Sequence, residues 1–399
     1  MPGNTLNRPE VVTDPSTTMT CLDAIGDMAL DLRARAIRAL PRMFLPDRGL
    51  FAFRLRREGG RDLVEGVSPR YTAIVLIAAA GESTDTVQSI LCGQSTAQVC
   101  DKVMDGASRS TDIGETGLAL WAARLLGHPG GQTVLERLRA LDPVGGRWPT
   151  VELAWCLTAL SVPQPGLDDA LAARLAGRLM ATLNESTGLF AHFPAGGTAG
   201  GLRSHVTCFA DCVYPVMAMS HYHRARGCDK ALDTARRCAD TMCALQGAGG
   251  QWWWHFDVRT GRVVERYPVY AVHQDAMGPM ALLDFHDAGG DAHWDAVHKS
   301  ILALDQPSRI KQSLIDTDAD VIWRKRARRE PGKFCRAAQA LASRIHPGLR
   351  APLTDVLFPP VCTDFESRPY HMGWILYAFS PRRMGLFESA DRGQVTADR

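Results

Sequence analysis

The sequence lacks several features that would assign a protein class at once. The longest uniformly apolar run, Ala73–Ala80, is far shorter than the roughly 20 residues that a membrane-spanning helix needs. Residues 1–18 are polar and rich in Pro and Thr, without the apolar core of a secretory signal. We therefore expect a cytoplasmic protein with no membrane span.

A large excess of charge of either sign is also absent. The chain of 399 residues has 45 Lys and Arg against 43 Asp and Glu, a formal net charge of +2. Nucleic-acid-binding domains are usually strongly basic, so no nucleic-acid partner is expected. The 11 cysteines are scattered and odd in number, and several fall in apolar helix-like segments, which favours reduced thiols used as small core residues.

Common catalytic and metal motifs are missing too. There is no P-loop, no His-Glu-x-x-His and no Gly-x-Ser-x-Gly. The run Asp316–Asp320 resembles the start of a calcium loop, but Val321 stands where that loop needs Gly. Cys208-x3-Cys212 has no partners at metal-site spacing. We expect neither a metal nor a cofactor.

What is present is helical periodicity over most of the chain, since 46% of residues are hydrophobic. About twelve helices of ordinary length are expected, and short strands around Gly49–Arg54, Trp252–Asp257 and Arg262–Tyr267. The expected helices are Cys21–Leu40, Tyr71–Ala80, Asp85–Met104, Glu115–Leu126, Val151–Leu160, Asp168–Leu183, Cys208–Arg226, Lys230–Leu245, Ala276–Phe285, Asp291–Leu304, Phe334–Ile345 and Tyr370–Phe379.

A weak repeat links these helices: a loop with Gly and an aromatic residue, followed by a helix that is often apolar throughout. The loops are Gly49-Leu-Phe51, Gly146-Arg-Trp148, Gly188-Leu-Phe190 and Gly250-Gln-Trp252. Apolar helices are buried and amphipathic ones face solvent. Pairs of one inner and one outer helix predict an all-α (α/α)6 toroid with short β-hairpins in its rim loops, with an open α-solenoid as the alternative. Residues 19–383 would form this single domain, between tails 1–18 and 384–399.

Polar and aromatic residues recur at one topological place, the loop before an apolar helix. In a toroid such loops meet on one rim around a cavity, which is the default position for a binding site. The clusters are Glu65–Tyr71, Asp112–Glu115, Trp148–Glu152, Asp211–Tyr214, Trp252–Asp275 and Asp364–His371.

Two of these clusters are richest in groups that transfer protons. Carboxylates, phenols and imidazoles are the usual acids and bases of enzymes. The candidate catalytic residues are Glu265, Tyr270, His273, Asp275, Asp364 and Glu366. The candidate substrate-binding residues are Arg70, Tyr71, Asp211, Trp252, Trp253, Trp254, His255, Arg368, Tyr370 and His371. The basic run Arg324–Arg329, with Lys333 and Arg336, is either a solvated surface or a patch for an anionic glycan or phosphate.

The alternating helices and the Trp/His/Tyr/carboxylate loops resemble the α/α-toroid superfamily of six-hairpin glycosidases, polysaccharide lyases, uronyl epimerases and terpenoid cyclases. Glu265-Arg-Tyr-Pro268, followed by Gly278 and Met280, is similar to a stretch of the C-terminal helical domain of glucuronyl C5-epimerases. The β-rich N-terminal region of those epimerases is absent here. Gln246–Trp252 fits one copy of the Gln-x3-Gly-x-Trp repeat of squalene-type cyclases.

We expect a carbohydrate-active enzyme whose substrate is a small molecule or oligosaccharide, with uronic-acid character. Two mechanisms stay open: glycosidic cleavage by two carboxylates, or abstraction of the C5 proton by Tyr or His. The alternatives are a cyclase that uses an Asp acid in an aromatic cavity, and a toroid scaffold without catalysis.

Overall fold

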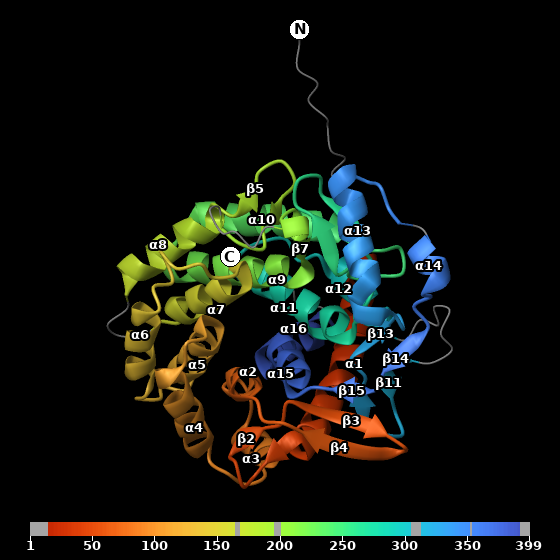
Figure 1. Cartoon of the computed structure of the whole chain (residues 1–399). Coiled ribbons are helices and arrows are strands. Elements are labelled where there is room, and N and C mark those ends of the chain that lie inside the picture. The colour runs from red at the N-terminus through yellow and green to blue at the C-terminus, as the bar shows by residue number, and fades with distance from the viewer. Residues whose placement is uncertain (1–14, 164–167, 195–200, 305–312, 352, 392–399) are drawn as a thin grey trace.

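The computed structural model describes residues 15–163, 168–194, 201–304, 313–351 and 353–391. Six helices form an inner ring, seen along its axis in Figure 1, and each follows an outer helix in the chain. The inner helices are α2 (Pro69–Ala79), α5 (Ile113–Leu125), α7 (Thr150–Ser161), α9 (Phe209–Arg226), α11 (Gly278–Asp287) and α15 (Pro369–Ala378). The outer helices are α1 (Pro15–Ala39), α4 (Thr96–Arg109), α6 (Gly131–Ala140), α8 (Asp169–Met180), α10 (Asp229–Ala244) and α12 (Trp294–Leu302).

The ring is closed. Each inner helix packs against the next in chain order, and α15 packs against α2, which joins the last pair to the first. In the outer layer α1 contacts α12. The fold is therefore an α/α toroid, as the sequence predicts, and not an open solenoid.

Composition explains which helices lie inside. Almost every residue of α2, α5, α7 and α15 is buried, whereas outer helices such as α4 and α10 bury one face only. Small residues let the inner helices approach closely. A Cβ at Gly117 of α5 would lie 2.8 Å from the Sγ of Cys156 on α7, so only glycine fits.

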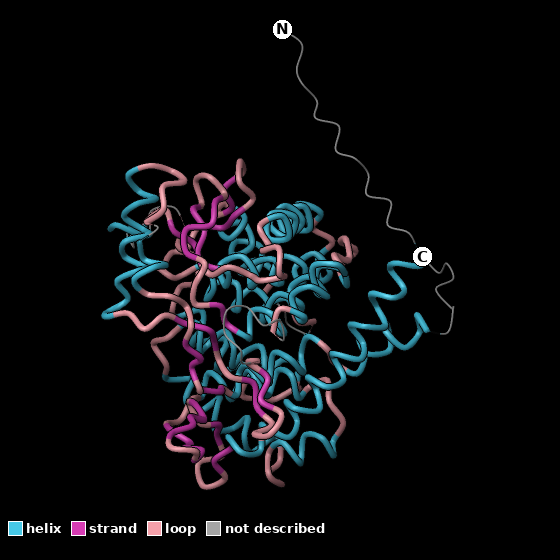
Figure 2. The backbone as a smooth tube through the Cα atoms, turned by 90° about the vertical axis from the view of Figure 1, so that its right-hand side faces the viewer, coloured by secondary structure: helices cyan, strands magenta, loops and turns pink. Residues whose placement is uncertain are grey.

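Short strands gather on one side of the ring, as Figure 2 shows. Three three-stranded antiparallel sheets, β10-β13-β14, β15-β3-β4 and β7-β8-β9, tie together loops that are distant in the sequence. The strands of these sheets are β3 (Arg54–Glu58), β4 (Arg61–Glu65), β7 (Val206–Cys208), β8 (His255–Asp257), β9 (Arg262–Glu265), β10 (Val269–Tyr270), β13 (Lys325–Ala327), β14 (Cys362–Asp364) and β15 (Glu366–Ser367). Three further hairpins pair β1 (Phe44–Leu45) with β2 (Leu50–Phe51), β5 (Leu183–Asn184) with β6 (Leu189–Phe190), and β11 (Ile315–Asp316) with β12 (Val321–Ile322).

Some predicted boundaries are wrong. The segment Asp85–Met104 is two helices, α3 (Thr84–Ile90) and α4, because the Ser95 side chain caps a new helix. The helices α6, α13 (Phe334–Ile345), α14 (Leu353–Leu357) and α16 (Pro381–Asp391) complete the set, and only α13 was predicted. The predicted tail 384–399 begins inside α16, which packs on α1 and buries Met384 and Phe387.

All ten cysteines for which the structure gives a side-chain state are free thiols. Within the described residues, no helix combines the length and the apolar character needed to cross a membrane.

Candidate functional site

The N-terminal ends of all six inner helices carry polar side chains that face one rim. Ser68 and Asp112 cap α2 and α5, and a π-helical turn, His273–Met277, precedes α11. π-Helical turns occur frequently at functional sites. Glu65 and Glu366 lie on this same rim, because Arg54 hydrogen-bonds to both. The clusters that the sequence places before apolar helices thus meet in space.

One cavity on this rim, the histidine pocket, has a volume of about 300 Å³. It is lined by His192, Arg203, Val206, Thr207, Cys208, Asp211, Trp254 and His255. His192 comes from the loop after β6, whereas His255 opens β8. The β7-β8 pairing places Cys208 opposite His255, and this brings the two loops together.

The first imidazole of this pocket is held by a carboxylate. The Nδ1 atom of His192 lies 2.9 Å from Asp211, which is fully buried at the start of α9. Asp211 also accepts hydrogen bonds from the Cys208 backbone N–H and the Thr207 hydroxyl. The hydrogen bond to Asp211 raises the pKa of His192, although burial opposes it. His192 therefore favours its protonated form.

The second imidazole is in the opposite electrostatic setting. Burial, with the positive charges of Arg203 and Arg336, holds the pKa of His255 well below its usual range. Arg203 lies 3.0 Å from the Nε2 atom of His255. A guanidinium can only donate, so Nε2 accepts and the imidazole proton is on Nδ1. His255 is therefore neutral and presents a basic nitrogen.

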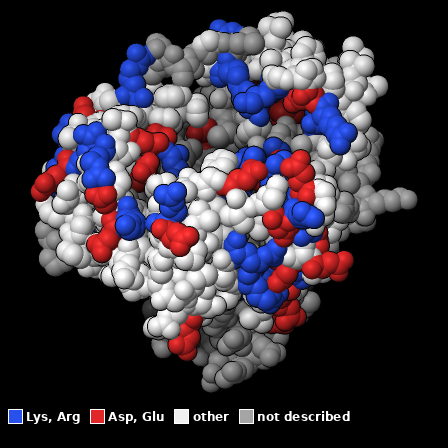
Figure 3. All heavy atoms as spheres, turned by 60° about the horizontal axis from the view of Figure 1, so that its bottom comes forward, with Lys and Arg blue, Asp and Glu red and all other residues white. Residues whose placement is uncertain are grey.

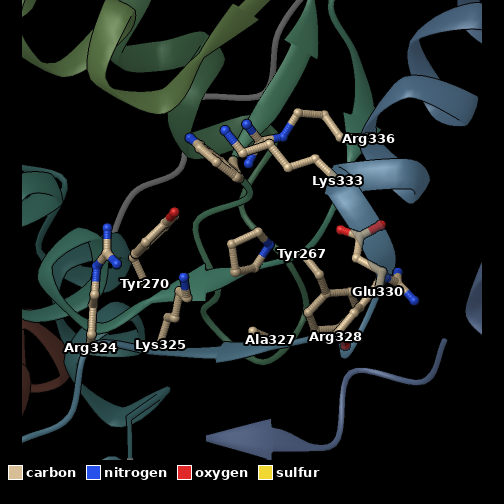
Figure 4. Close-up of a pocket in the computed structure, with 11 residues that line it drawn as sticks. Tyr267, Tyr270, Arg324, Lys325, Ala327, Arg328, Glu330, Lys333 and Arg336 are labelled. Atoms are coloured by element: carbon tan, nitrogen blue, oxygen red, sulfur yellow. The ribbon is translucent and has the colours of Figure 1, made fainter. Parts of the chain in front are cut away.

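A second cavity, the cationic pocket, has a volume of about 330 Å³ and shares Trp254 with the histidine pocket. Figure 4 shows its side chains. They are Trp254, Tyr267, Pro268, Tyr270, Arg324, Lys325, Ala327, Arg328, Glu330, Lys333 and Arg336. Tyr270 lies edge-on to Trp254 at 5.0 Å between ring centroids. Five basic residues against one acidic residue make this pocket strongly positive.

Beyond Tyr270 lie the predicted residue His273 and a second His–Asp pair, also made of predicted residues. The rings of Tyr270 and His273 are 5.0 Å apart, and burial lowers the pKa of His273 to about 3. The Nε2 atom of His371 lies 2.7 Å from Asp275, which is fully buried. Burial raises the pKa of Asp275, although His371 opposes this shift. Asp275 orients the His371 ring, and neither residue lines the two cavities described above.

The last predicted cluster is organised by arginines. Arg368 hydrogen-bonds to Glu366 and to the Tyr71 hydroxyl, the latter at 2.7 Å. The Tyr71 and Tyr370 rings are 4.7 Å apart. Burial alone would raise the pKa of Glu366, but Arg368 and Arg324 outweigh it and hold that pKa below its usual range. Glu366 is an ion-pair centre, a poor position for a general acid.

Asp364 is likewise engaged, 3.1 Å from Lys325. The catalytic role of Asp364 and Glu366 stays a prediction, and the structure shows both carboxylates held in ion pairs.

Three further predicted residues lie away from the cavities. Trp252 is only 1% exposed and stacks on Phe209 in the core, so it cannot offer a face to substrate. Trp253 lies edge-on to Tyr267. Glu265 is buried, accepts a hydrogen bond from the Tyr267 backbone and lies 3.6 Å from Arg328. Of the three consecutive tryptophans, only Trp254 lines the cavities.

Two carboxylates from the rim clusters, Asp112 and Glu152, were not among the candidate site residues. They lie at the starts of the inner helices α5 and α7. Arg70, which was a candidate, hydrogen-bonds to both oxygens of Asp112, at 2.5 and 2.6 Å, and lies 3.6 Å from Glu152. Burial and the charge of Asp112 raise the pKa of Glu152. Gly114 permits this packing, since a Cβ there would lie 2.9 Å from Glu152.

Sequence reasoning also missed His192 and Arg203. His192 follows Gly188-Leu-Phe190, one of the Gly-aromatic loops, so that repeat already contained a signal for it. No sequence signal pointed to Arg203, because its position depends on the β7-β8 pairing. His192, Cys208 and Asp211 are also close enough to hold a metal ion. The Oδ2 atom of Asp211, however, already accepts hydrogen bonds from the Thr207 hydroxyl and the Cys208 backbone N–H.

Comparisons with known proteins establish the fold. No family model matches the chain, and no curated protein matches it by sequence. Among solved structures, it is similar to a sugar epimerase from a ruminal bacterium, with a TM-score of 0.60 and 10% identity, covering 90% of this chain and 98% of that one.

An unsaturated glucuronyl hydrolase specific for heparin gives a TM-score of 0.56 at 13% identity, covering 93% and 98%. A family 105 glycoside hydrolase of C. acetobutylicum gives 0.51 at 14%, covering 80% and 93%. At these identities the likeness concerns architecture, and the chain has the α/α-toroid fold of the six-hairpin glycosidase type.

Proposed function

We propose that the protein is a carbohydrate-active enzyme that moves a proton on a uronic-acid residue bound in the histidine pocket. The observation that carries this proposal is that His192 and His255 line one cavity while their pKa values are shifted in opposite directions. In an acid–base pair, one group must be protonated and the other unprotonated at the same pH. Opposite pKa shifts therefore identify the acid and the base.

The chemistry follows from the substrate. The C5 proton of a uronate is acidic because the adjacent carboxylate delocalises the negative charge that its loss creates. In this proposal Arg203 turns from His255 to the substrate carboxylate, which frees the Nε2 atom of His255. That nitrogen accepts the C5 proton, and the guanidinium stabilises the charge that develops on the carboxylate oxygens. Trp254 stacks on His255 at 4.3 Å between ring centroids, and this contact holds the imidazole in place beside the bound sugar.

The second histidine completes the reaction. Asp211 holds Nδ1 of His192, so Nε2 is the atom that exchanges a proton with the substrate. A proton delivered to C5 from the opposite face gives the epimer. A proton delivered to the departing oxygen at C4 gives a C4–C5 double bond with loss of that group. In either outcome His255 then passes its proton to water and His192 takes one up from water, which restores both starting forms.

The named structural neighbours support a sugar substrate. A sugar epimerase and an unsaturated glucuronyl hydrolase are both built on this toroid. The test is incubation with oligouronates of defined sequence, followed by NMR of the products. Formation of a C5 epimer or of an unsaturated uronate supports the proposal. Conversion to neither, with a panel that includes both uronate epimers, would contradict it.

Glycosidic cleavage is the second candidate, favoured by Asp112 and Glu152. These carboxylates share Arg70, and burial raises the pKa of Glu152, as expected of a general acid. If this pair is catalytic, Glu152→Gln abolishes release of a reducing end, whereas His255→Gln leaves that release intact. The proton-transfer proposal expects the reverse dependence.

The remaining alternatives have less support. A cyclase-type acid would come from Asp316–Asp320, but Asp316 accepts a hydrogen bond from Trp323 and Asp320 pairs with Arg38 on α1. A scaffold would have its cavity filled by its own side chains, whereas two cavities of about 300 Å³ or more are open on the rim. A cytoplasmic location remains part of the proposal, and thiol titration of the denatured, unreduced protein should count close to 11 thiols.

A further inference from the structure

The basic run Arg324–Arg336 has no role in the proton transfer proposed above, yet it lines a cavity. In Figure 4, Lys333 and Arg336 reach into the cationic pocket from the side opposite Arg324 and Lys325. Lys333 precedes α13, Arg336 lies in its first turn, and β13 begins at Lys325. Two elements close together in the chain, β13 and α13, therefore direct cations into one space.

Not all of these cations are neutralised by the protein. Arg324 and Lys325 pair with Glu366 and Asp364, and Arg328 pairs with Asp355 at 2.6 Å. Within the described residues, Lys333, Arg336 and Arg203 form no ion pair with any carboxylate. Glu330, the acid of the pocket, accepts a hydrogen bond from the Cys335 backbone at the start of α13.

The two unpaired guanidiniums stand on either side of Trp254. Arg336 lies over the Trp254 ring, 4.0 Å from its centroid, and Arg203 lines the histidine pocket on the other side. Burial, followed by the charge of Arg336, lowers the pKa of Arg203. Half-buried like charges that form no ion pair repel each other, so an anion between them would be stabilising.

We infer that the cationic pocket binds a second anionic unit of the substrate, on the far side of Trp254 from the reacting sugar. This inference rests on the proposed function for the position of the reacting uronate, and it names the substrate class as a polyanionic oligosaccharide. The anion is a carboxylate or an ester of sulfuric or phosphoric acid, since guanidinium and ammonium groups bind all of these oxyanions. A neighbouring sugar unit would lie in the cationic pocket, where its anionic group reaches Lys333 and Arg336.

Isothermal titration calorimetry at low ionic strength tests the inference without requiring turnover. One ligand pair is an unsulfated chondroitin disaccharide and its 6-sulfated form, and the other is galacturonate and digalacturonate. We expect the second anion to tighten binding at least about tenfold, the value of one charge-assisted hydrogen bond. Tighter binding by only one pair supports the inference and shows which oxyanion the pocket prefers. Equal affinity within both pairs would overturn it.

Variants make the test specific. The double substitution Lys333→Gln and Arg336→Gln should erase the gain from the second anion while leaving the singly charged ligands unaffected. Lys333→Gln alone, at an exposed position, should remove part of the gain and serves if the double variant does not fold. Lys230→Gln, an exposed cation on the outer helix α10, is the matched control and should change nothing. A gain that survives the double variant would contradict the inference.

The same titration separates the two proposals. His255→Gln should keep the preference for a second anion, because that residue lies in the histidine pocket. A protein that shows this preference but no turnover leaves the anion pocket standing while the proton-transfer proposal fails. A protein with uronate turnover and no such preference leaves the proton transfer standing and overturns the anion pocket.

Discussion

Both rims of the ring have buried Asp, His and Tyr side chains, but the two rims differ in how completely these groups are hydrogen-bonded. On the rim opposite the cavities described above, Asp284 is 1% exposed, and its oxygens lie 2.5 Å from Arg383, 3.0 Å from the Tyr377 hydroxyl and 3.2 Å from His221. Burial alone would raise the pKa of Asp284, but His221 and Arg383 lower it well below its usual range. Both oxygens of the Asp284 carboxylate therefore have hydrogen-bond partners.

At the N-terminal rim the polar groups are left incomplete. Asp275 makes one hydrogen bond, to His371, and its other oxygen is buried without a partner in the described structure. The Nδ1 atoms of His255 and His273 are unpartnered as well. Buried groups of this kind reduce stability and are typical of functional sites. One rim therefore holds the ring together, and the other is suited to chemistry. In Figure 3, acidic and basic side chains are interspersed on the surface, so net charge alone does not reveal this division.

The largest expected effect is on turnover. Replacing His255 with Gln removes the base, and positioned proton transfer contributes roughly 10²–10⁴-fold in rate. We expect kcat to fall by about that factor while the melting temperature stays the same or rises, because a buried, partly unpartnered ring is removed. A variant with normal kcat, measured by NMR on an oligouronate that the enzyme converts, would remove His255 from the mechanism.

The opposite rim should respond in stability. Arg383→Met leaves the buried Asp284 without its guanidinium, and breaking a buried pair in this way costs about 3–5 kcal/mol of unfolding free energy. Urea denaturation measures this loss. Arg382→Gln is the control, since Arg382 is largely exposed and Asp287 keeps its ion pair with Arg383, so the loss should be at most about 1 kcal/mol. Comparable small losses for both variants would show that the two rims do not differ as described.

Acid should destabilise the protein through the cavity rim. The folded-state pKa of His273 is about 3, below its unfolded value of about 6.5, so the unfolded chain binds protons first as pH falls. His255 shifts in the same direction. The free energy of unfolding should therefore decline as pH drops below about 6.5 and continue to decline toward about 3. His273→Phe should flatten this decline, which urea titrations between these pH values can measure.

The smallest expected effect is a displaced pH profile. The raised pKa of His192 places the alkaline limb of kcat above about 6.5, because the acid must stay protonated. Asp211→Asn removes the charge that raises this pKa, so the alkaline limb should move to lower pH while the acidic limb, set by His255, stays in place. A profile that shifts at both limbs, or at neither, would argue against this division of roles.

The architecture was readable from the sequence because it depends on local periodicity. Helices buried all round, such as Val151–Leu160, differ plainly from amphipathic ones, and ring closure follows from the need to bury them. The helices that escaped prediction, α6, α14 and α16, have 5 to 11 residues, and isolated helices of this length need packing to be stable.

The site was only partly readable. The Trp252–Asp275 cluster was predicted, and Trp254, His255 and Tyr270 from it do line the cavities. Which side chains of this cluster face the cavities depends on the alternation along β8 and on how far each residue lies from the cavity. The sequence does not give that distance. Arg203 and Arg336 are distant in the chain and come together across Trp254 only in the folded ring.

Exchange of the C5 proton with solvent tests the central claim most directly. With an oligouronate in D2O, NMR should show loss of the C5 proton signal in the presence of the wild-type protein and of Glu152→Gln. With His255→Gln the rate of loss should fall by roughly 10²–10⁴-fold. Cleavage of the glycosidic bond by the wild-type protein with the C5 proton retained would contradict the account, and would assign the chemistry to Asp112 and Glu152 instead.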